Sequence, residues 1–301
     1  MLSTNDFYEK LTFDKSKNIL EQLKDFTLNQ FPKICKNLSD FNEISEEFSS
    51  FVSKLTLEFA KIWNIQLYID RNWYKIIIDG FEDLLCNSLY DTIMNLFPFD
   101  DENKINYDLY NNITLKTFKI NDYDYQSHKD EIQLQISKFK EFSVFKTPKQ
   151  KLIVLSNLCN YINYTYANRD RNKLLNFLTF MLMHSKIENL QNELIYCLLF
   201  RNKTVIESDE DFYLSIALQT RKNFQIYAKK INTIQNKEDL YEDEIIESEE
   251  KMKEIKNIND IPTDLLNKDF DNNEKMKLHK YELLRQSFRN ILNKINENNN
   301  N

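Results

Sequence analysis

The chain has 301 residues, of which only one is glycine and four are proline. Average usage would supply roughly 7 % glycine, so this composition excludes sites built on glycine, such as a dinucleotide-binding fingerprint or a phosphate-binding loop. The 40 basic and 47 acidic residues give a net charge of -7, which opposes a nucleic-acid backbone, and we expect no nucleic-acid partner.

Apolar residues at steps of three and four predict helices in the N-terminal third of the chain. A short stripe over 19–31 is expected to end at Pro32, because proline breaks the helical hydrogen-bond ladder. Longer stripes predict helices over 44–63 and 73–97. The sequence leaves open whether residues 1–70 share a core with the rest.

The segment 101–145 is ambiguous. Leu134 lies at a strand spacing between Ile132 and Ile136, whereas Phe139 continues a helical spacing from the same two isoleucines. The scarcity of glycine favours the helix.

Helical stripes recur from 148 to about 230, and residues 174–183 are apolar nearly all round, as in a buried central helix. A charge run follows at 237–257, and then an amphipathic stretch at 274–296. The final asparagines are expected to be disordered. Composition and periodicity therefore predict an all-α protein.

The cysteines and the N-terminus indicate a cytosolic protein, or one bound to a membrane from outside. Four isolated cysteines among apolar neighbours are predicted to be buried thiols of a reducing compartment: Cys35, Cys86, Cys159 and Cys197. The first residues are polar and acidic, unlike a signal peptide. No window approaches the roughly twenty apolar residues of a membrane span, so we expect no transmembrane segment.

No catalytic or metal-binding cluster stands out. The three histidines, His128, His184 and His279, have no partner at the spacing of a metal site or a catalytic triad. The carboxylates of the charge run are interpreted as solvated charge. We therefore expect no metal and no cofactor.

Three segments carry the motifs of one family in the same order. TPKQKLIVLSNLCNYIN at 147–163 is similar to TPRDKL…L..C..I, and HSKIENLQNELIYCLLFRN at 184–202 is similar to KANPPNLHSNLEYIxxFRN. Upstream, GFEDLLCNSLYDTIM at 80–94 is similar to GLEKYVMxxLYxxxF. Over about 75–230 the chain thus resembles the Vps-nine (vacuolar protein sorting nine) domain family and its preceding helical bundle. Members of this family are exchange factors for endosomal Rab GTPases.

The resemblance implies an all-α fold in which a helical bundle packs on a Vps-nine-like helical domain. The predicted organisation, in chain order, is N-terminal helices at 1–70, the bundle at 71–146, the Vps-nine-like domain at 147–232, an acidic linker at 233–273, and an amphipathic helix with a disordered tail at 274–301.

The resemblance also implies a function: nucleotide exchange on a Rab GTPase of the Rab-five subfamily, bound in its nucleotide-free or GDP form. The protein would then be cytoplasmic and peripheral on endosomal or vesicular membranes. In the family, an aspartate at the start of the central helix reaches the nucleotide pocket and pairs with the lysine of the GTPase's phosphate loop. This exchange needs no covalent step. The alternative is a weakened pseudo-exchange factor, or an adaptor or scaffold that holds a Rab without opening its pocket.

This sequence differs from the family motif at the position of the catalytic aspartate. The family's ADDFLPVL is met by residues 171–178, so Asn172 replaces the aspartate and Asn176 replaces the proline. Asparagine can accept a hydrogen bond, but it lacks the charge. Asp170 lies two residues upstream and could serve if the loop shifts.

The last matched block predicts residues that face the GTPase. The family's GYYFTNL is met by residues 211–217, with Phe212 and Tyr213 in place of the two tyrosines and Ser215 in place of the threonine. An aromatic ring at Phe212 and a hydroxyl group at Ser215 are thus retained, although the residue types differ from those of the family.

Each of these residues also has a purely structural interpretation. Asn172 and Asp170 could be the N-cap of a helix that starts at Leu174, because both residue types favour that position. Phe212 and Tyr213 could be packing residues.

Two further residues of the motif are expected to have structural roles. Tyr196 lies in an apolar stripe and is expected in the core. Arg201 is expected at the surface or at a helix C-terminus, where positive charge is favoured.

Overall fold

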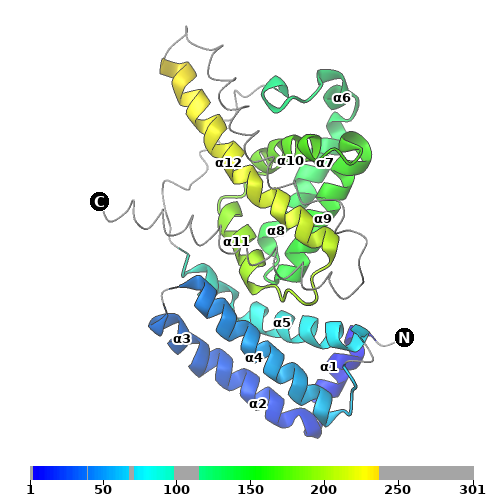
Figure 1. The fold of residues 1–301 in the computed structure, drawn as a ribbon, viewed down its shortest axis with the longest axis vertical. Coiled ribbons are helices and arrows are strands. Elements are labelled where there is room, and N and C mark those ends of the chain that lie inside the picture. The colour runs from blue at the N-terminus through cyan, green and yellow to red at the C-terminus, as the bar shows by residue number, and fades with distance from the viewer. Residues whose placement is uncertain (1–2, 39, 68–70, 98–114, 237–301) are drawn as a thin grey trace, which may run out of the picture. The chain divides into compact units, whose positions relative to one another are not determined.

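The computed structural model of the chain describes residues 3–38, 40–67, 71–97 and 115–236, and Figure 1 shows its ribbon. Every regular element in these ranges is a helix, which confirms the predicted all-α fold. None of the described helices is long and apolar enough to cross a membrane. The predicted acidic linker and terminal helix fall almost entirely at 237–301, outside the described residues.

The N-terminal part consists of short helices followed by two long ones. These are α1 (Thr4–Thr12), α2 (Lys17–Asp25), the π-helical turn η2 (Phe26–Gln30), α3 (Phe31–Asn37), α4 (Phe41–Ile62) and α5 (Arg71–Met94). The long helices α4 and α5 confirm the two long apolar stripes. Asp40 begins α4 by accepting a hydrogen bond from the backbone N–H of Asn42 at 2.7 Å.

The expected helix end at Pro32 is wrong, because the helical run continues through α3 to Asn37. At the end of η2 the N–H of Phe31 bonds to the carbonyl of Phe26, five residues earlier. This local change of hydrogen-bond pattern places Pro32 in the first turn of α3, where a proline is tolerated.

The single glycine, Gly80, lies where α1 meets α5. A Cβ atom at Gly80 would overlap the ring of Phe7. The Phe7 ring also packs against Phe59 and Phe81, with centroids 5.1 Å apart in each pair. Glycine therefore serves a close approach between helices here, not a turn.

The second half of the described chain is built around a central helix. Its elements are η5 (Leu115–Phe118), α6 (Asp122–Ser127), α7 (Lys129–Phe139), α8 (Glu141–Val144), α9 (Pro148–Ile162), the π-helical turn η6 (Asn163–Ala167), α10 (Arg171–Ser185), α11 (Leu190–Phe200) and α12 (Ser208–Asn236). The central helix is α10, which packs against α7, α9 and α12 (Figure 1). Its residues 177–183 are all buried, as predicted from the all-round apolar pattern.

Helix α7 resolves the ambiguous segment. Ile132, Ile136 and Phe139 are buried, whereas Leu134 is 52 % exposed. A strand would have placed Leu134 on the same face as the two isoleucines, so the helical interpretation is confirmed for this part of 101–145.

Residues 1–70 share their core with the helices that follow. Phe48 of α4 packs against Phe200 of α11, with ring centroids 5.3 Å apart. Helix α4 contacts both α5 and α11, and α5 contacts α9.

A buried ion cluster joins α5 to the loop after α11. The Arg201 Nη1 atom lies 2.6 Å from Asp79 Oδ1 and 2.6 Å from Glu82 Oε2, and Lys149 Nζ lies 2.8 Å from Asp79 Oδ2. Burial raises the pKa of Glu82, while Arg201 and the backbone N–H of Asn202 oppose that rise. Arg201 is the C-cap residue of α11, which confirms the expected helix C-terminus. The alternative of a surface position is wrong, because the side chain is buried and its charge is neutralised by carboxylates of α5.

A second polar cluster lies beside the first. Lys151 of α9 is fully buried and lies 2.8 Å from Glu193 of α11, which also accepts a hydrogen bond from the hydroxyl of Tyr90. Tyr196 is buried, as predicted, and its hydroxyl donates to the carbonyl of Lys146 at 2.8 Å. Both clusters connect α5 to the helices after Pro148.

The cysteines follow the predicted pattern with one exception. Cys86, Cys159 and Cys197 are buried, and burial raises the pKa of each thiol. Cys35 on α3 is only half-buried, so the prediction of a buried thiol is wrong there.

Candidate functional site

The residues singled out from the sequence lie at the beginnings of two helices: Asp170, Asn172 and Asn176 at the start of α10, and Phe212, Tyr213 and Ser215 at the start of α12. The two helices pack along each other, and α12 also packs on α9 (Figure 1). The turn η6 leads from α9 into the start of α10, and its side chains reach α12.

Asp170 is the N-cap of α10. Its Oδ1 accepts hydrogen bonds from the backbone N–H groups of Asn172 at 2.8 Å and of Lys173 at 3.2 Å. The cap interpretation is thus confirmed for Asp170, although α10 begins at Arg171 and not at Leu174. The carboxylate of Asp170 already satisfies the free N–H groups of the helix start.

Asn172 lies in the first turn of α10 and is not the cap. Its side chain is exposed and has no hydrogen-bond partner among the described residues. Asn176 follows one turn later on the same helix face and is half-buried. A free carboxamide therefore stands at the position where the family resemblance implies a carboxylate.

The turn before α10 has an unusual backbone. Asn168 and Arg169 both have positive φ angles, of 45° and 67°, in the left-handed region that favours glycine. The N–H of Asp170 then bonds to the carbonyl of Ala167 at 2.8 Å and closes the turn. The side chains of Arg169 and Arg171 are exposed on either side of Asp170, and Lys173 is exposed beyond them.

Tyr213 joins the start of α12 to the end of α9. Its hydroxyl donates to Asn160 Oδ1 at 2.6 Å and accepts from Asn163 Nδ2 at 3.1 Å. The ring is buried, with 6 % of its surface exposed. Tyr213 therefore supports the site from inside, and its packing interpretation is confirmed.

Phe212 and Ser215 lie on the outer side of the same helix start. Phe212 is 41 % exposed, so the packing interpretation holds for part of the ring and the rest is open to solvent. Ser215 is half-buried, and its hydroxyl donates to the carbonyl of Phe212 at 2.7 Å. The serine oxygen can still accept a hydrogen bond from a partner.

Asn160 and Asn163, which hold η6 against α12, were not predicted as part of the site. Their spacing of three residues places both on one face of a helix, next to the apolar stripe of α9. This pair of amides at the end of an apolar helix was the available signal. Tyr164, which directly follows Asn163 and is 88 % exposed, was not predicted either.

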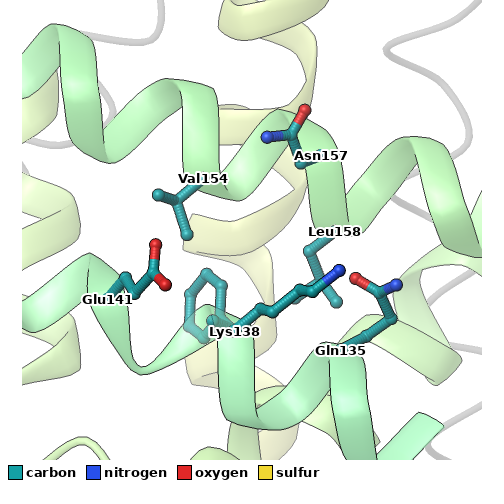
Figure 2. A pocket seen from close by; sticks show the side chains of 7 residues that line it. Gln135, Lys138, Glu141, Val154, Asn157 and Leu158 are labelled. Carbon is teal, nitrogen blue, oxygen red and sulfur yellow. The ribbon is translucent and has the colours of Figure 1, made fainter. Parts of the chain in front are cut away.

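A small cavity lies elsewhere, between α7 and α9. It has a volume of about 250 Å³ and is lined by Gln135, Lys138, Phe139, Glu141, Val154, Asn157 and Leu158. Figure 2 shows these side chains entering it from the two sides. None of the candidate residues borders this cavity, so the candidate site is a surface and not this pocket.

The histidines show no arrangement for catalysis or metal binding in the described residues. His184 is half-buried, and its Nδ1 lies 2.8 Å from the carbonyl oxygen of Phe180. Burial lowers the pKa of His184. No group of histidine, cysteine or acidic side chains in the described ranges is placed to hold a metal, and His279 lies outside them.

Comparison with known proteins identifies the region that contains the candidate site. Residues 132–224 match the family model of the Vacuolar sorting protein 9 (VPS9) domain. The match runs from α7 into α12 and includes all the candidate residues. No curated protein matches the chain.

The match confirms the resemblance read from the sequence. A VPS9 domain indicates, in general terms, Rab GTPase binding and nucleotide exchange. The segment 80–94 lies outside the match, so its resemblance to the preceding bundle stays a prediction. The predicted domain boundaries also stay predictions.

Proposed function

We propose that this chain, which carries a VPS9 domain at residues 132–224, is a guanine nucleotide exchange factor for an endosomal Rab GTPase of the Rab-five subfamily. It would be cytoplasmic and would act in vesicle trafficking, peripherally on endosomal or vesicular membranes where its Rab resides. The observation that carries this proposal is the exposed start of α10 within the matched domain, where the side chain of Asn172 faces solvent without a partner among the described residues.

The proposed mechanism is competition for the nucleotide pocket of the Rab. An exchange factor accelerates GDP release if it binds the nucleotide-free GTPase more tightly than the GDP-bound one. Asn172 would accept a hydrogen bond from the phosphate-loop lysine in place of a phosphate oxygen. Phe212 would pack on the GTPase beside it, with Ser215 and Asn176 at the edges of the contact. No covalent bond forms or breaks.

A weakened exchange factor or Rab-binding adaptor is the second candidate, and the geometry of α10 favours it. A charge-assisted hydrogen bond is about twice as strong as a neutral one, so Asn172 stabilises the open pocket less than an aspartate would. Asp170 uses Oδ1 for both capping bonds, which hold its carboxylate against the helix start and limit its reach into the pocket of a partner. The exposed cations Arg169, Arg171 and Lys173 also disfavour an approach to a lysine.

The test is release of fluorescent GDP from a panel of Rab GTPases. We expect a Rab-five subfamily member to release GDP slowly in the presence of the wild-type chain. The Asn172→Asp variant should increase this release rate about tenfold over wild type, because it restores the charge-assisted bond. Asn157→Asp is the matched control, because it adds the same charge at an exposed asparagine of α9 and should leave the rate unchanged.

The Asp170→Asn variant tests whether Asp170 supplies the carboxylate that acts on the Rab, since asparagine keeps the capping bonds but removes the charge. We expect this variant to match wild type in the release assay. If wild type is already fast and Asp170→Asn slows it, Asp170 is the catalytic residue and the role given to Asn172 is wrong. If no Rab in the panel binds the chain in its nucleotide-free form, the chain is neither an exchange factor nor a Rab-binding adaptor.

A further inference from the structure

We infer that Tyr164 is a further contact residue for the GTPase, which pairs with Phe212 to form a two-point aromatic contact and sets the affinity for the partner. The inference rests on the proposed function. Tyr164 is 88 % exposed and Phe212 is 41 % exposed. Tyr164 makes no side-chain hydrogen bond and no ring contact in the described part of the chain, and its phenol group acts electrostatically on Tyr213.

A hydrogen bond between their neighbours brings the two residues to the same junction of η6 and α12. Asn163 donates to the hydroxyl of Tyr213 at 3.1 Å, and these two residues directly precede Tyr164 and directly follow Phe212. Each exposed ring is therefore one residue away from the same buried contact between η6 and α12. The pairing extends the surface of α12 onto η6.

The backbone that carries Tyr164 is fixed from both sides. Before it, Asn163 is tied to α12; after it, Tyr166 stacks on Phe177 of α10 with ring centroids 4.1 Å apart. Ala167 is buried, and the N–H of Asn168 closes η6 by bonding to the carbonyl of Asn163 at 2.9 Å. An exposed ring on such an ordered turn loses little conformational freedom when it binds, which is the advantage of aromatic contact residues.

The surroundings of the pair favour a protein partner. Aromatic side chains are enriched among residues that dominate binding energy, and they are typically surrounded by polar residues that exclude water. The exposed polar residues that follow η6 in the chain are Arg169, Arg171 and Asn172, around the start of α10. π-helical turns also occur frequently at functional sites, and η6 is one.

The experiment measures binding of the full chain to a nucleotide-free Rab that wild type binds. We expect Tyr164→Ala to weaken binding at least tenfold, and Tyr164→Phe to stay within about threefold, because the ring and not the hydroxyl makes the contact. Tyr123→Ala is the matched control. Tyr123 is 77 % exposed on α6, outside the matched residues 132–224, and its removal should leave binding unchanged. Thermal unfolding of each variant shows that the fold is intact.

Three results would overturn the inference, and they are distinguishable. If wild type binds a Rab and Tyr164→Ala binds it equally well, the inference fails and the proposed function stands. If wild type binds no Rab, the proposed function fails as well. If Tyr164→Ala instead abolishes self-association of the chain in light scattering while Rab binding is unchanged, the ring serves a second copy of the chain and not a GTPase.

Discussion

Gly80 shows how the absence of a side chain allows two helices to approach each other closely. We predict that Gly80→Ala destabilises the protein by about 1–3 kcal/mol, because the added methyl group must displace the packed ring of Phe7. This cost exceeds the gain of about 1 kcal/mol that alanine normally brings to a helix interior. Urea denaturation measures the difference. Ser88→Ala, on the exposed face of the same helix, should change the free energy of unfolding by less than about 0.5 kcal/mol. A Gly80→Ala variant more stable than wild type would contradict the packing argument.

Single residues were predictable where the local pattern determined their environment. Tyr196 lies in an apolar stripe, so its burial followed from its neighbours. The burial of Arg201 was not predictable in this way, because its carboxylate partners Asp79 and Glu82 lie on α5, far earlier in the chain. The exposure of Asn172 and Phe212 could be expected only through the family resemblance, since both residue types also suit a cap or a core.

The contact between η6 and α12 depends on one hydroxyl group. We predict that Tyr213→Phe costs about 1–2 kcal/mol of stability, because it removes the bonding partner of Asn160 and of Asn163, whose Oδ1 is already buried without a partner in the described structure. Urea denaturation measures the loss, and amide hydrogen exchange should increase in residues 163–167. Tyr164→Phe removes an exposed hydroxyl from the neighbouring tyrosine and should leave stability unchanged. Unaltered exchange in Tyr213→Phe would show that η6 is held by other contacts.

Helices were predictable from the sequence where apolar periodicity was long and unbroken. Helices α4, α5 and α10 follow directly from their stripes, and the all-round pattern of α10 indicated its central position. The helical run through Pro32 was not predictable in the same way, because it depends on the π-helical turn η2. The turn η6 was also missed, since its bonds to α12 join residues that are distant in the sequence.

The buried ion cluster couples the N-terminal helices to the VPS9 domain. We predict that Glu82→Ala destabilises the protein by about 3 kcal/mol or more, because Arg201 loses one of its two buried carboxylates. Both tryptophans, Trp63 and Trp73, precede the VPS9 domain, so their fluorescence reports the N-terminal helices while circular dichroism reports all helices. The two urea transitions should coincide in wild type and separate in Glu82→Ala.

The ion pair of Lys75 with Glu207 is the matched control, because it also connects α5 to the loop before α12 but is open to solvent, with 35 % and 63 % of the two side chains exposed. Lys75→Ala should cost at most about 1 kcal/mol and should leave the two transitions coincident. Equal effects of the two variants would mean that burial does not determine the coupling.

The same ion cluster affects where the chain can be cut. A fragment limited to residues 132–224 would keep Arg201 and Lys149 but lose the carboxylates of Asp79 and Glu82. The face of Phe200 that packs on Phe48 would become exposed to solvent. Such a fragment would carry cations that have lost their buried partners, and it would also carry an uncovered apolar surface, which promotes aggregation. The stretch of chain that matches the VPS9 domain is thus shorter than the stretch that we expect must be expressed together for that domain to remain folded.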